Sequence, residues 1–125
     1  MNDTTFHPTP EQQKRIAVLY KPGPEGKSIE PTEHWLSALT PDRSPNPSGG
    51  LFSTAADLAR FYQMILGGGR LGAARVVSED AVREMTRLQT DDLKTGFTSG
   101  NGWGLGWGIV RQPQGVTEML SPGTF

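Results

Sequence analysis

Serine is the residue type of this chain that could act as a nucleophile, and it needs a base beside it to attack a carbonyl group. The chain has two histidines, His7 and His34, that could supply that base. One hypothesis is therefore a hydrolase that pairs Ser53 or Ser121 with one of these histidines. Neither serine lies in the Gly-x-Ser-x-Gly turn that exposes the nucleophile of many hydrolases. This hypothesis is therefore weaker than the two that are described below.

Charge and composition argue against several other classes of function. Twelve Lys and Arg against thirteen Asp and Glu give a net charge of -1, so there is no electrostatic basis for binding nucleic acid or an anionic membrane surface. The chain has no cysteine, and its two histidines are too far apart in sequence to form a helical metal pair. We therefore expect no metal and no cofactor. No apolar run reaches the roughly 18 residues of a membrane span.

The elements that would position any site begin with a helix at 54–66, which has clear start and stop signals. Thr54 can cap its N-terminus, and Asp57 can return a bond to the N–H group of the cap residue in a capping box. The triple glycine at 67–69 can end the helix because it readily adopts left-handed backbone. Four apolar residues recur at helical spacing and predict one buried stripe: Leu58, Phe61, Tyr62 and Ile65.

Residues 1–20 are expected to hold a short helix and a strand. Thr9 and Gln12 have the spacing of a second capping box, and a proline occupies the first helical position. This pattern predicts a helix from Pro10 to about Arg15. The apolar run at 16–20 then predicts a strand.

Residues 21–50 form an excursion rich in proline and glycine. The spacing of apolar residues is compatible with a short helix around 32–39, and the rest is expected to be irregular. Excursions of this length in compact domains tend to be functional loops or disordered segments.

Residues 51–90 are expected to form a helical pair. After an extended link at 76–77, Ser78 can cap a second helix. Its first turn carries Glu79 and Asp80, whose charges favour the positive end of the helix dipole. Three apolar residues would face the first helix: Val82, Met85 and Leu88.

Residues 101–125 are expected to contribute one sheet strand, at 103–110, and a tail. Large apolar residues alternate with glycines along this strand, so one face would be apolar and the other would carry no side chains. The glycine face would allow a helix or a second strand to pack at short distance. The alternative is that Trp103 and Trp107 form a platform for a carbohydrate or another planar ligand.

Four segments of the chain resemble the penicillin-recognising serine hydrolases, which include class C β-lactamases, related esterases and D-Ala-D-Ala carboxypeptidases. They are Met-x-Asp-Thr-x-Phe at 1–6, Gly-Gly-Leu-x-Ser-Thr-x-x-Asp-Leu-x-x-Phe at 49–61, Gly-Trp-Gly-Leu-Gly-Trp-Gly at 102–108 and Ser-Pro-Gly-Thr-Phe at 121–125. The segments occur in the order found in that family and span essentially the whole chain. The resemblance implies an α+β fold of the β-lactamase/transpeptidase type, of which residues 1–125 would be a single partial domain.

The catalytic motifs of that family do not occur in the chain. Its members carry a Ser-x-x-Lys nucleophile pair, a Tyr-x-Asn or Tyr-x-Ser motif, and a Lys-Thr-Gly or His-x-Gly strand. No serine here is followed three residues later by lysine, and neither tyrosine is followed by the required Asn or Ser. Lys94-Thr95-Gly96 matches the third motif in sequence, but it precedes the tryptophan-rich strand and lies in a polar, turn-rich run. We therefore expect no catalytic residue in this chain.

The resemblance implies that the chain is a fragment, inactive by itself, of a serine hydrolase. The intact parent would hydrolyse a β-lactam, a D-Ala-D-Ala peptide or an ester through an acyl-enzyme. Ser48, Gly49 and Gly50 would edge the substrate cleft, and Gly49 matches a position where class C β-lactamases place a tyrosine, which implies a more open pocket. Relatives commonly act outside the cytoplasm, so the parent is expected to be periplasmic or secreted.

Two further expectations concern the isolated chain. The alternative to a hydrolase fragment is a non-catalytic binding module that uses the Gly-rich cleft rim and the tryptophans. The strand at 103–110 would lack neighbours in a fragment, and an unpaired apolar strand favours pairing between molecules. We therefore expect self-association through this strand, or poor order within it.

Overall fold

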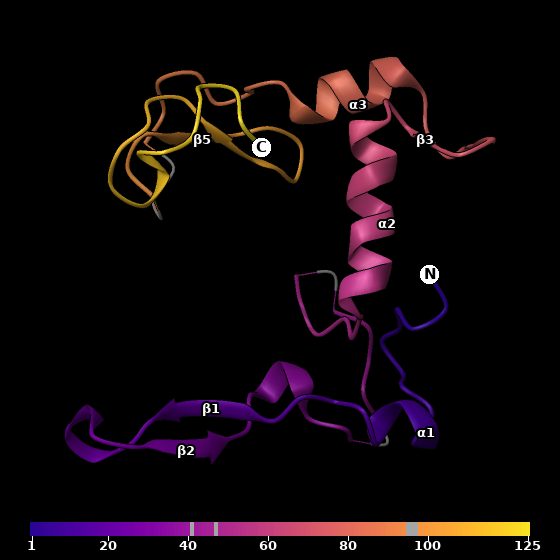
Figure 1. Cartoon of the computed structure of the whole chain (residues 1–125), viewed down its shortest axis with the longest axis vertical. Helices are drawn as coiled ribbons and strands as arrows, with labels where there is room; N and C mark the ends of the chain where they lie inside the picture. The colour runs from indigo at the N-terminus through magenta and orange to yellow at the C-terminus, as the bar shows by residue number, and fades with distance from the viewer. Residues whose placement is uncertain (41, 47, 95–97) are drawn as a thin grey trace. The chain divides into compact units, whose positions relative to one another are not determined.

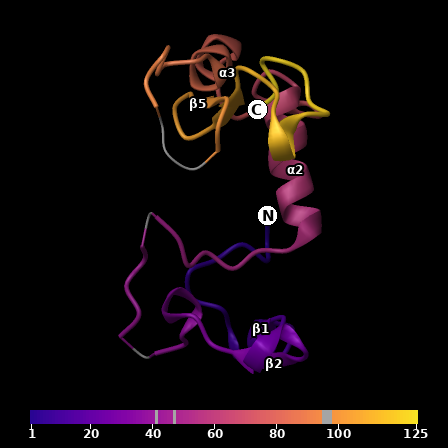
Figure 2. The same cartoon turned by 90° about the vertical axis from the view of Figure 1, so that its left-hand side faces the viewer.

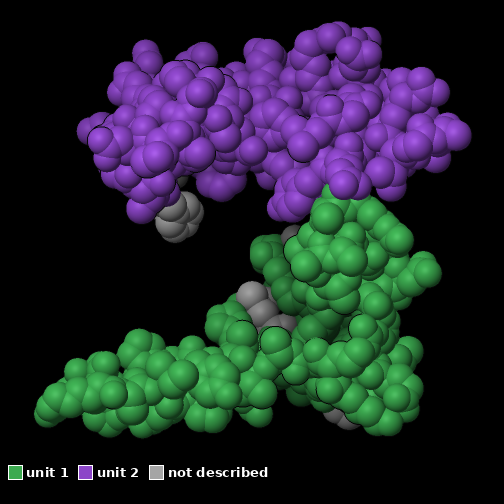
Figure 3. Space-filling model, in the orientation of Figure 1, with its two compact units in different colours: residues 1–60 green, residues 61–125 purple. Residues whose placement is uncertain are grey.

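The computed structural model describes residues 1–40, 42–46, 48–94 and 98–125. The chain divides into two compact units, Met1–Arg60 and Phe61–Phe125, which Figure 3 shows in different colours. The described elements are short helices and antiparallel two-stranded sheets. This mixture confirms the predicted α+β class.

The first helix, α1 (Pro10–Gln13), begins where predicted and has a complete capping box. The Gln12 N–H group donates to Thr9 Oγ1 at 3.3 Å, and the Thr9 N–H group donates to Gln12 Oε1 at 2.9 Å. The helix ends at Gln13 rather than near Arg15. The reason is that the N–H groups of Arg15 and Ile16 bond to carbonyls three residues back, which tightens the chain into a turn.

A β-hairpin follows, formed by β1 (Leu19–Pro22) and β2 (Ile29–Thr32) (Figure 1). The prediction placed the strand at 16–20, which is too early. The register depends on a turn at η1 (Pro24–Gly26), because the Gly23 N–H group donates to the Ser28 carbonyl at 2.9 Å. The position of that turn, rather than the apolar run, decides which residues pair.

The remainder of the excursion is irregular, as Figure 2 shows for the purple-to-magenta loop that precedes α2. The helix suggested around 32–39 is only a single 3-10 turn, η2 (Trp35–Ser37), because Thr32 is paired within the hairpin. Residues 41 and 47 lie outside the described part of the loop.

The helix α2 (Ala55–Leu66) begins at the predicted cap. The Asp57 N–H group donates to Thr54 Oγ1 at 3.2 Å. The second half of the predicted capping box is wrong, because the Asp57 carboxylate accepts hydrogen bonds from the Asp3 N–H group and the Thr4 hydroxyl, both at 2.9 Å. A long-range contact has replaced the local one.

The C-terminus of α2 confirms the predicted glycine stop. The Gly68 N–H group donates to the Ile65 carbonyl at 3.0 Å, and the Gly69 N–H group donates to the Met64 carbonyl at 2.9 Å, which together form a Schellman motif. Gly68 and Gly69 have φ values of 62° and 88°. A Cβ atom at Gly69 would also lie 2.2 Å from the Val77 carbonyl oxygen. Both the positive φ and the lack of space therefore require glycine at this position.

The core of the second unit confirms only part of the predicted stripe. Ile65 is buried and Phe61 is half-buried, whereas Leu58 and Tyr62 are 42% and 50% exposed. Met64, which the stripe omitted, is buried instead. The core cluster of the unit consists of Met64, Ile65 and Val82, with Phe61, Val77 and Trp107 packed against it.

The second long helix, α3 (Glu79–Thr86), is capped as predicted, with Ser78 Oγ accepting from the Ala81 N–H group at 3.0 Å. A small hairpin of β3 (Arg70–Leu71) and β4 (Ala74–Arg75) precedes it. Of the three apolar residues expected to face α2, Val82 is in the core cluster. Met85 and Leu88 are half-buried.

The strand predicted at 103–110 is wrong, since the structure has a hairpin there. The strands β5 (Asn101–Trp103) and β6 (Gly108–Val110) pair antiparallel. The reversal between them is closed by the Gly104 N–H group, which donates to the Trp107 carbonyl at 2.8 Å, and Gly106 has a φ of 83°. Glycines that alternate with large residues are compatible with a strand, but they also allow this tight reversal.

Candidate functional site

A broad hollow with a volume of about 1150 Å³ lies within the first unit. It is bounded by the N-terminal segment, α1, the β1–β2 hairpin and the segment that leads into α2. Its apolar lining comes from Pro8, Ile16, Ala17, Val18, Leu19, Ala38, Leu39, Leu51 and Phe52. Polar side chains also line it, so the hollow offers the combination of apolar surface and a few polar groups that is typical of small-molecule sites.

The structure places the three predicted cleft residues next to each other, but only Gly50 lines the hollow. Gly50 has a φ of 84°, a conformation that favours glycine. Ser48 lies in an adjacent turn, where its N–H group and its hydroxyl both bond to Asn46 Oδ1, at 3.0 and 2.7 Å. The Gly49 N–H group donates to the Asn46 carbonyl at 3.0 Å. Their role as a cleft edge stays a prediction.

A buried carboxylate fastens the N-terminal segment to the start of α2. Asp57 is only 4% exposed and accepts from the Thr4 hydroxyl and the Asp3 N–H group. Burial raises the pKa of the Asp57 carboxyl, but these hydrogen bonds, together with the positive charges of the N-terminal amino group and Arg60, hold the pKa below its ordinary value. The Thr4 hydroxyl also lies 2.9 Å from the Ser53 hydroxyl. The Ser53 hydroxyl is therefore bonded within a hydroxyl–carboxylate cluster.

A backbone bridge reinforces this junction. The Thr5 N–H group donates to the Phe52 carbonyl at 2.9 Å, and the Phe52 N–H group donates to the Thr5 carbonyl at 2.9 Å. Two of the segments singled out in the sequence, 1–6 and 49–61, are thus held side by side. Sequence reasoning did not predict that these two segments meet. Asp57, at the third position of α2, was a possible signal of a contact with the N-terminal segment.

The rim of the hollow carries an exposed ion pair. Arg15 Nη2 lies 2.5 Å from Asp3 Oδ1, and both side chains line the hollow. The hydrogen bond from Arg15, followed by that from Gln12, holds the pKa of the Asp3 carboxyl below its ordinary value. Exposed ion pairs of this kind contribute little to the free energy of folding. This pair does place one negative and one positive charge at the rim.

Arg43 was also missed by sequence reasoning. Its Nη1 donates to the Ala38 carbonyl at 2.8 Å, and its Nη2 donates to the Gly50 carbonyl. Its guanidinium carbon lies 5.0 Å from the centre of the Phe52 ring, which is within the range of a cation–π contact. No motif marks this arginine, because its contacts depend on how the irregular loop folds.

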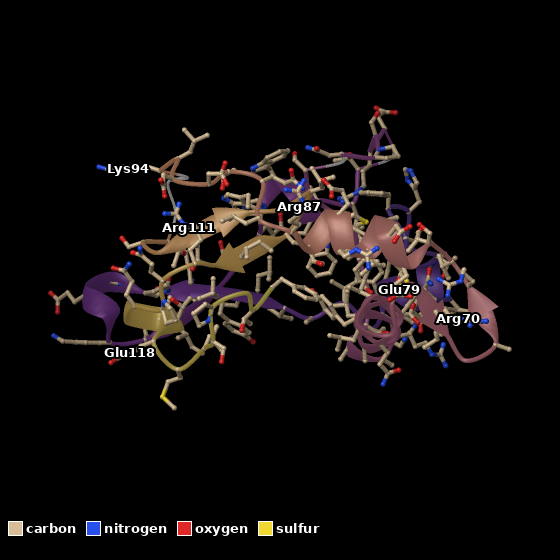
Figure 4. The ribbon with its side chains drawn as sticks, turned by 90° about the horizontal axis from the view of Figure 1, so that it is seen from above. Arg70, Glu79, Arg87, Lys94, Arg111 and Glu118 are labelled. Atoms are coloured by element: carbon tan, nitrogen blue, oxygen red, sulfur yellow. The ribbon has the colours of Figure 1, made fainter. Side chains whose placement is uncertain are left out.

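The structure gives the following positions and contacts for three of the remaining candidate residues. Lys94 is exposed, and its side chain projects outward from its loop (Figure 4). The other two residues of that tripeptide, 95 and 96, lie outside the described residues. The backbone carbonyl of Ser121 accepts a bond from the Thr124 N–H group, and the His7 N–H group donates to Thr5 Oγ1.

Within residues 1–40, 42–46, 48–94 and 98–125, no group of three or more His, Cys, Asp or Glu side chains could hold a metal ion. No helix in the same ranges has the length and apolar character needed to cross a membrane.

The two tryptophans are separated by the β5–β6 turn and do not share a strand, so the predicted platform is wrong in its geometry. Trp107 lies parallel to the Phe61 ring at a centroid distance of 6.0 Å. Its ring also makes edge contacts with Tyr62 and Phe125. Trp103 is 40% exposed. Trp107 therefore contributes to packing in its unit.

The predicted close approach to the glycine face is confirmed at two positions. A Cβ atom at Gly102 would lie 2.4 Å from Leu88 Cδ1, and one at Gly104 would lie 2.2 Å from the Met85 carbonyl oxygen. A Cβ atom at Gly106 or Gly108 would meet nothing within 4 Å. The last turn of α3 and the segment that follows it thus pack against the first half of the glycine-rich hairpin.

Comparison with known proteins agrees with the resemblance seen in the sequence. Similar proteins include two from Mycobacterium tuberculosis, Protein Rv1367c of strain ATCC 25618 / H37Rv and Uncharacterized protein MT1414 of strain CDC 1551 / Oshkosh. Each is 33% identical over 133 residues, which cover 98% of this chain and 32% of the relative. The chain thus spans about a third of the length of these relatives. The family model named Beta-lactamase matches residues 1–125, and the chain therefore belongs to the Beta-lactamase family.

Proposed function

We propose that the first unit forms one wall of the substrate cleft of a serine hydrolase whose catalytic groups lie outside this chain. The observation that carries the proposal is the hollow of about 1150 Å³ in the first unit. Gly50, which belongs to the segment at 49–61, lines this hollow. The sequence supports this separation of substrate binding from catalysis, because it contains no Ser-x-x-Lys pair and no Tyr-x-Asn motif.

The reaction would be acylation and deacylation of a serine. A serine activated by a neighbouring lysine and tyrosine would attack the carbonyl carbon of a lactam, a peptide or an ester and form a tetrahedral oxyanion. Collapse of that intermediate would break the bond to the amine or alcohol, which leaves in the case of a peptide or an ester and stays attached to the acyl group when a lactam ring opens. Water would then hydrolyse the acyl-enzyme. The residues of this chain would bind and orient the substrate rather than move protons.

The hollow supports an assignment of roles within binding. Its apolar lining, which includes Leu39, Leu51 and Phe52, suits an aliphatic or aromatic acyl group. The Asp3–Arg15 pair at the rim suits polar parts of the substrate. Glycine rather than a larger residue at positions 49 and 50 favours an open pocket, so we propose a broad substrate range that includes esters and peptides as well as β-lactams.

The experiment compares this chain with a longer protein expressed from the same gene together with its flanking coding sequence. We expect the chain alone to leave a chromogenic cephalosporin and p-nitrophenyl acetate unhydrolysed, and the longer protein to hydrolyse at least one of them. A fluorescent penicillin should label only the longer protein, and replacement of the serine of its Ser-x-x-Lys pair by alanine should abolish labelling. Turnover by the chain alone that disappears in Ser53→Ala would overturn the proposal.

A further inference from the structure

Arg43 is a half-buried cation without an acidic partner among the ion pairs of the described residues. Its guanidinium instead donates to two backbone carbonyls, those of Ala38 and Gly50, and lies over the ring of Phe52. Its Nε atom is buried and has no hydrogen-bond partner within the described residues. Burying such a donor costs free energy, so a purely stabilising role explains the arrangement poorly.

The three groups that Arg43 contacts have one property in common. Ala38, Gly50 and Phe52 all line the hollow, whereas Arg43 does not. The guanidinium therefore lies behind the wall of the hollow and joins the two ends of the loop that runs from residue 38 to residue 50. Phe52 is fixed on its other side by its backbone bridge to Thr5.

The chemistry of this contact requires arginine. A planar guanidinium can donate to two carbonyls in different directions while its face stacks on an aromatic ring. A lysine ammonium is a compact charge that cannot reproduce this fork. Gly50 has no side chain that could pack against a neighbour, and its φ is 84°. The hydrogen bond from Arg43 to its carbonyl is therefore an effective way to fix its position.

We propose that Arg43 is a positioning residue that sets the location of the Gly50–Phe52 wall and thereby the size of acyl group that the cleft accepts. The proposal deepens the proposed function and rests on it for its kinetic part. Its structural part can be tested on the chain as it stands.

The structural test is hydrogen exchange measured by mass spectrometry on Arg43→Met, which keeps the aliphatic stem but loses the donors. We expect amides in 48–52 to exchange on the order of tenfold faster, because two charge-assisted hydrogen bonds are lost. Arg75→Met is the matched control, since Arg75 also donates to two carbonyls, those of Gly68 and Val77, in the other unit. It should accelerate exchange near those residues and leave 48–52 unchanged.

Arg43→Lys separates the fork from the charge, and we expect it to exchange as fast at 48–52 as Arg43→Met. Unchanged exchange in Arg43→Met, or full protection in Arg43→Lys, would overturn the positioning role. Unaltered exchange in the β1–β2 hairpin confirms that the first unit of each Arg43 variant is folded.

The kinetic test uses the longer protein with p-nitrophenyl esters of increasing acyl length. We expect Arg43→Met to change KM about fivefold more for the octanoate than for the acetate, because a displaced wall alters binding of the longer chain. Equal changes for all esters would overturn the specificity role. If the wild-type longer protein shows no turnover, the proposed function fails, and the exchange experiment still decides whether Arg43 holds the wall.

Discussion

Thr4 Oγ1 lies 2.9 Å from Asp57 Oδ2, although 53 positions separate the two residues in the sequence. The same carboxylate oxygen accepts from the Asp3 N–H group, so one buried charge holds the N-terminal segment against the first turn of α2. A buried carboxylate that loses its donors is costly, and donors that lose the carboxylate are left without an acceptor.

The first prediction follows from this junction. Asp57→Ala should destabilise the first unit more than Thr54→Ala does, because it removes two hydrogen bonds to a buried group rather than one. Urea denaturation of the two variants measures this order. Asp92→Ala is the matched control, since Asp92 is an exposed partner of Arg111, and it should have almost no effect. An Asp57 variant as stable as the Asp92 variant would mean that the junction does not hold the segment.

The second prediction concerns the pH dependence of the same group. The pKa of Asp57 is lower in the folded chain than its ordinary value of 3.8, so the folded state favours the ionised form. Its stabilising contribution should be fully present above that ordinary value and lost as the pH falls through the lower folded pKa. Acid titration of the wild type and Asp57→Asn should give stability curves that converge below pH 3.8. Parallel curves through this range would contradict the prediction.

The third prediction compares a helix cap with a charged loop residue. Thr54→Ala should cost roughly 1 kcal/mol, because the Asp57 N–H group loses its acceptor at the helix N-terminus. Lys94→Ala should cost almost nothing, since its side chain is exposed. The reversed order of urea midpoints would mean that the cap is misassigned and that Lys94 contributes to stability.

Local signals in the sequence predicted local structure well. The capping box of Thr9 and Gln12, the Ser78 cap and the glycine stop after α2 each involve groups within a few residues, so the residues alone specify them. The Asp57 carboxylate shows where this fails, because a remote donor displaced the expected local bond. The β5–β6 turn and the Arg43 contacts were missed for another reason. The glycine pattern at 102–108 fits a strand as well as a turn, and no motif specifies how the irregular loop around Arg43 folds.

The fourth prediction tests the close approach at the glycine-rich hairpin. Gly104→Ala should destabilise the second unit by about 1–3 kcal/mol, because its Cβ atom would lie 2.2 Å from the backbone oxygen of Met85, which cannot move without shifting the chain. Gly108→Ala is the control, since nothing lies within 4 Å of the added atom. It should be neutral or slightly stabilising. Thermal unfolding of both variants measures the difference, and equal losses would show that the end of α3 does not pack there.

The last prediction concerns self-association of the isolated chain, which was expected from an unpaired strand. The structure pairs β6 with β5 on one side, and on the other side the Val110 N–H group donates to the Thr124 carbonyl at 2.9 Å. The exposed apolar side chains of the hairpin include Trp103 at the end of β5 and Leu105 in the turn, which are 40% and 54% exposed.

Any association through this hairpin should therefore be driven by apolar side chains rather than by a free strand edge. Leu105→Lys should shift the chain toward monomer in light scattering after size exclusion, because a charged side chain at the turn opposes apolar contact. Leu93→Lys, at another exposed apolar residue of the same unit, is the control and should leave the distribution unchanged. A wild-type chain that stays monomeric at high concentration, with protected amides in both strands, would show that the internal partners of the hairpin suffice.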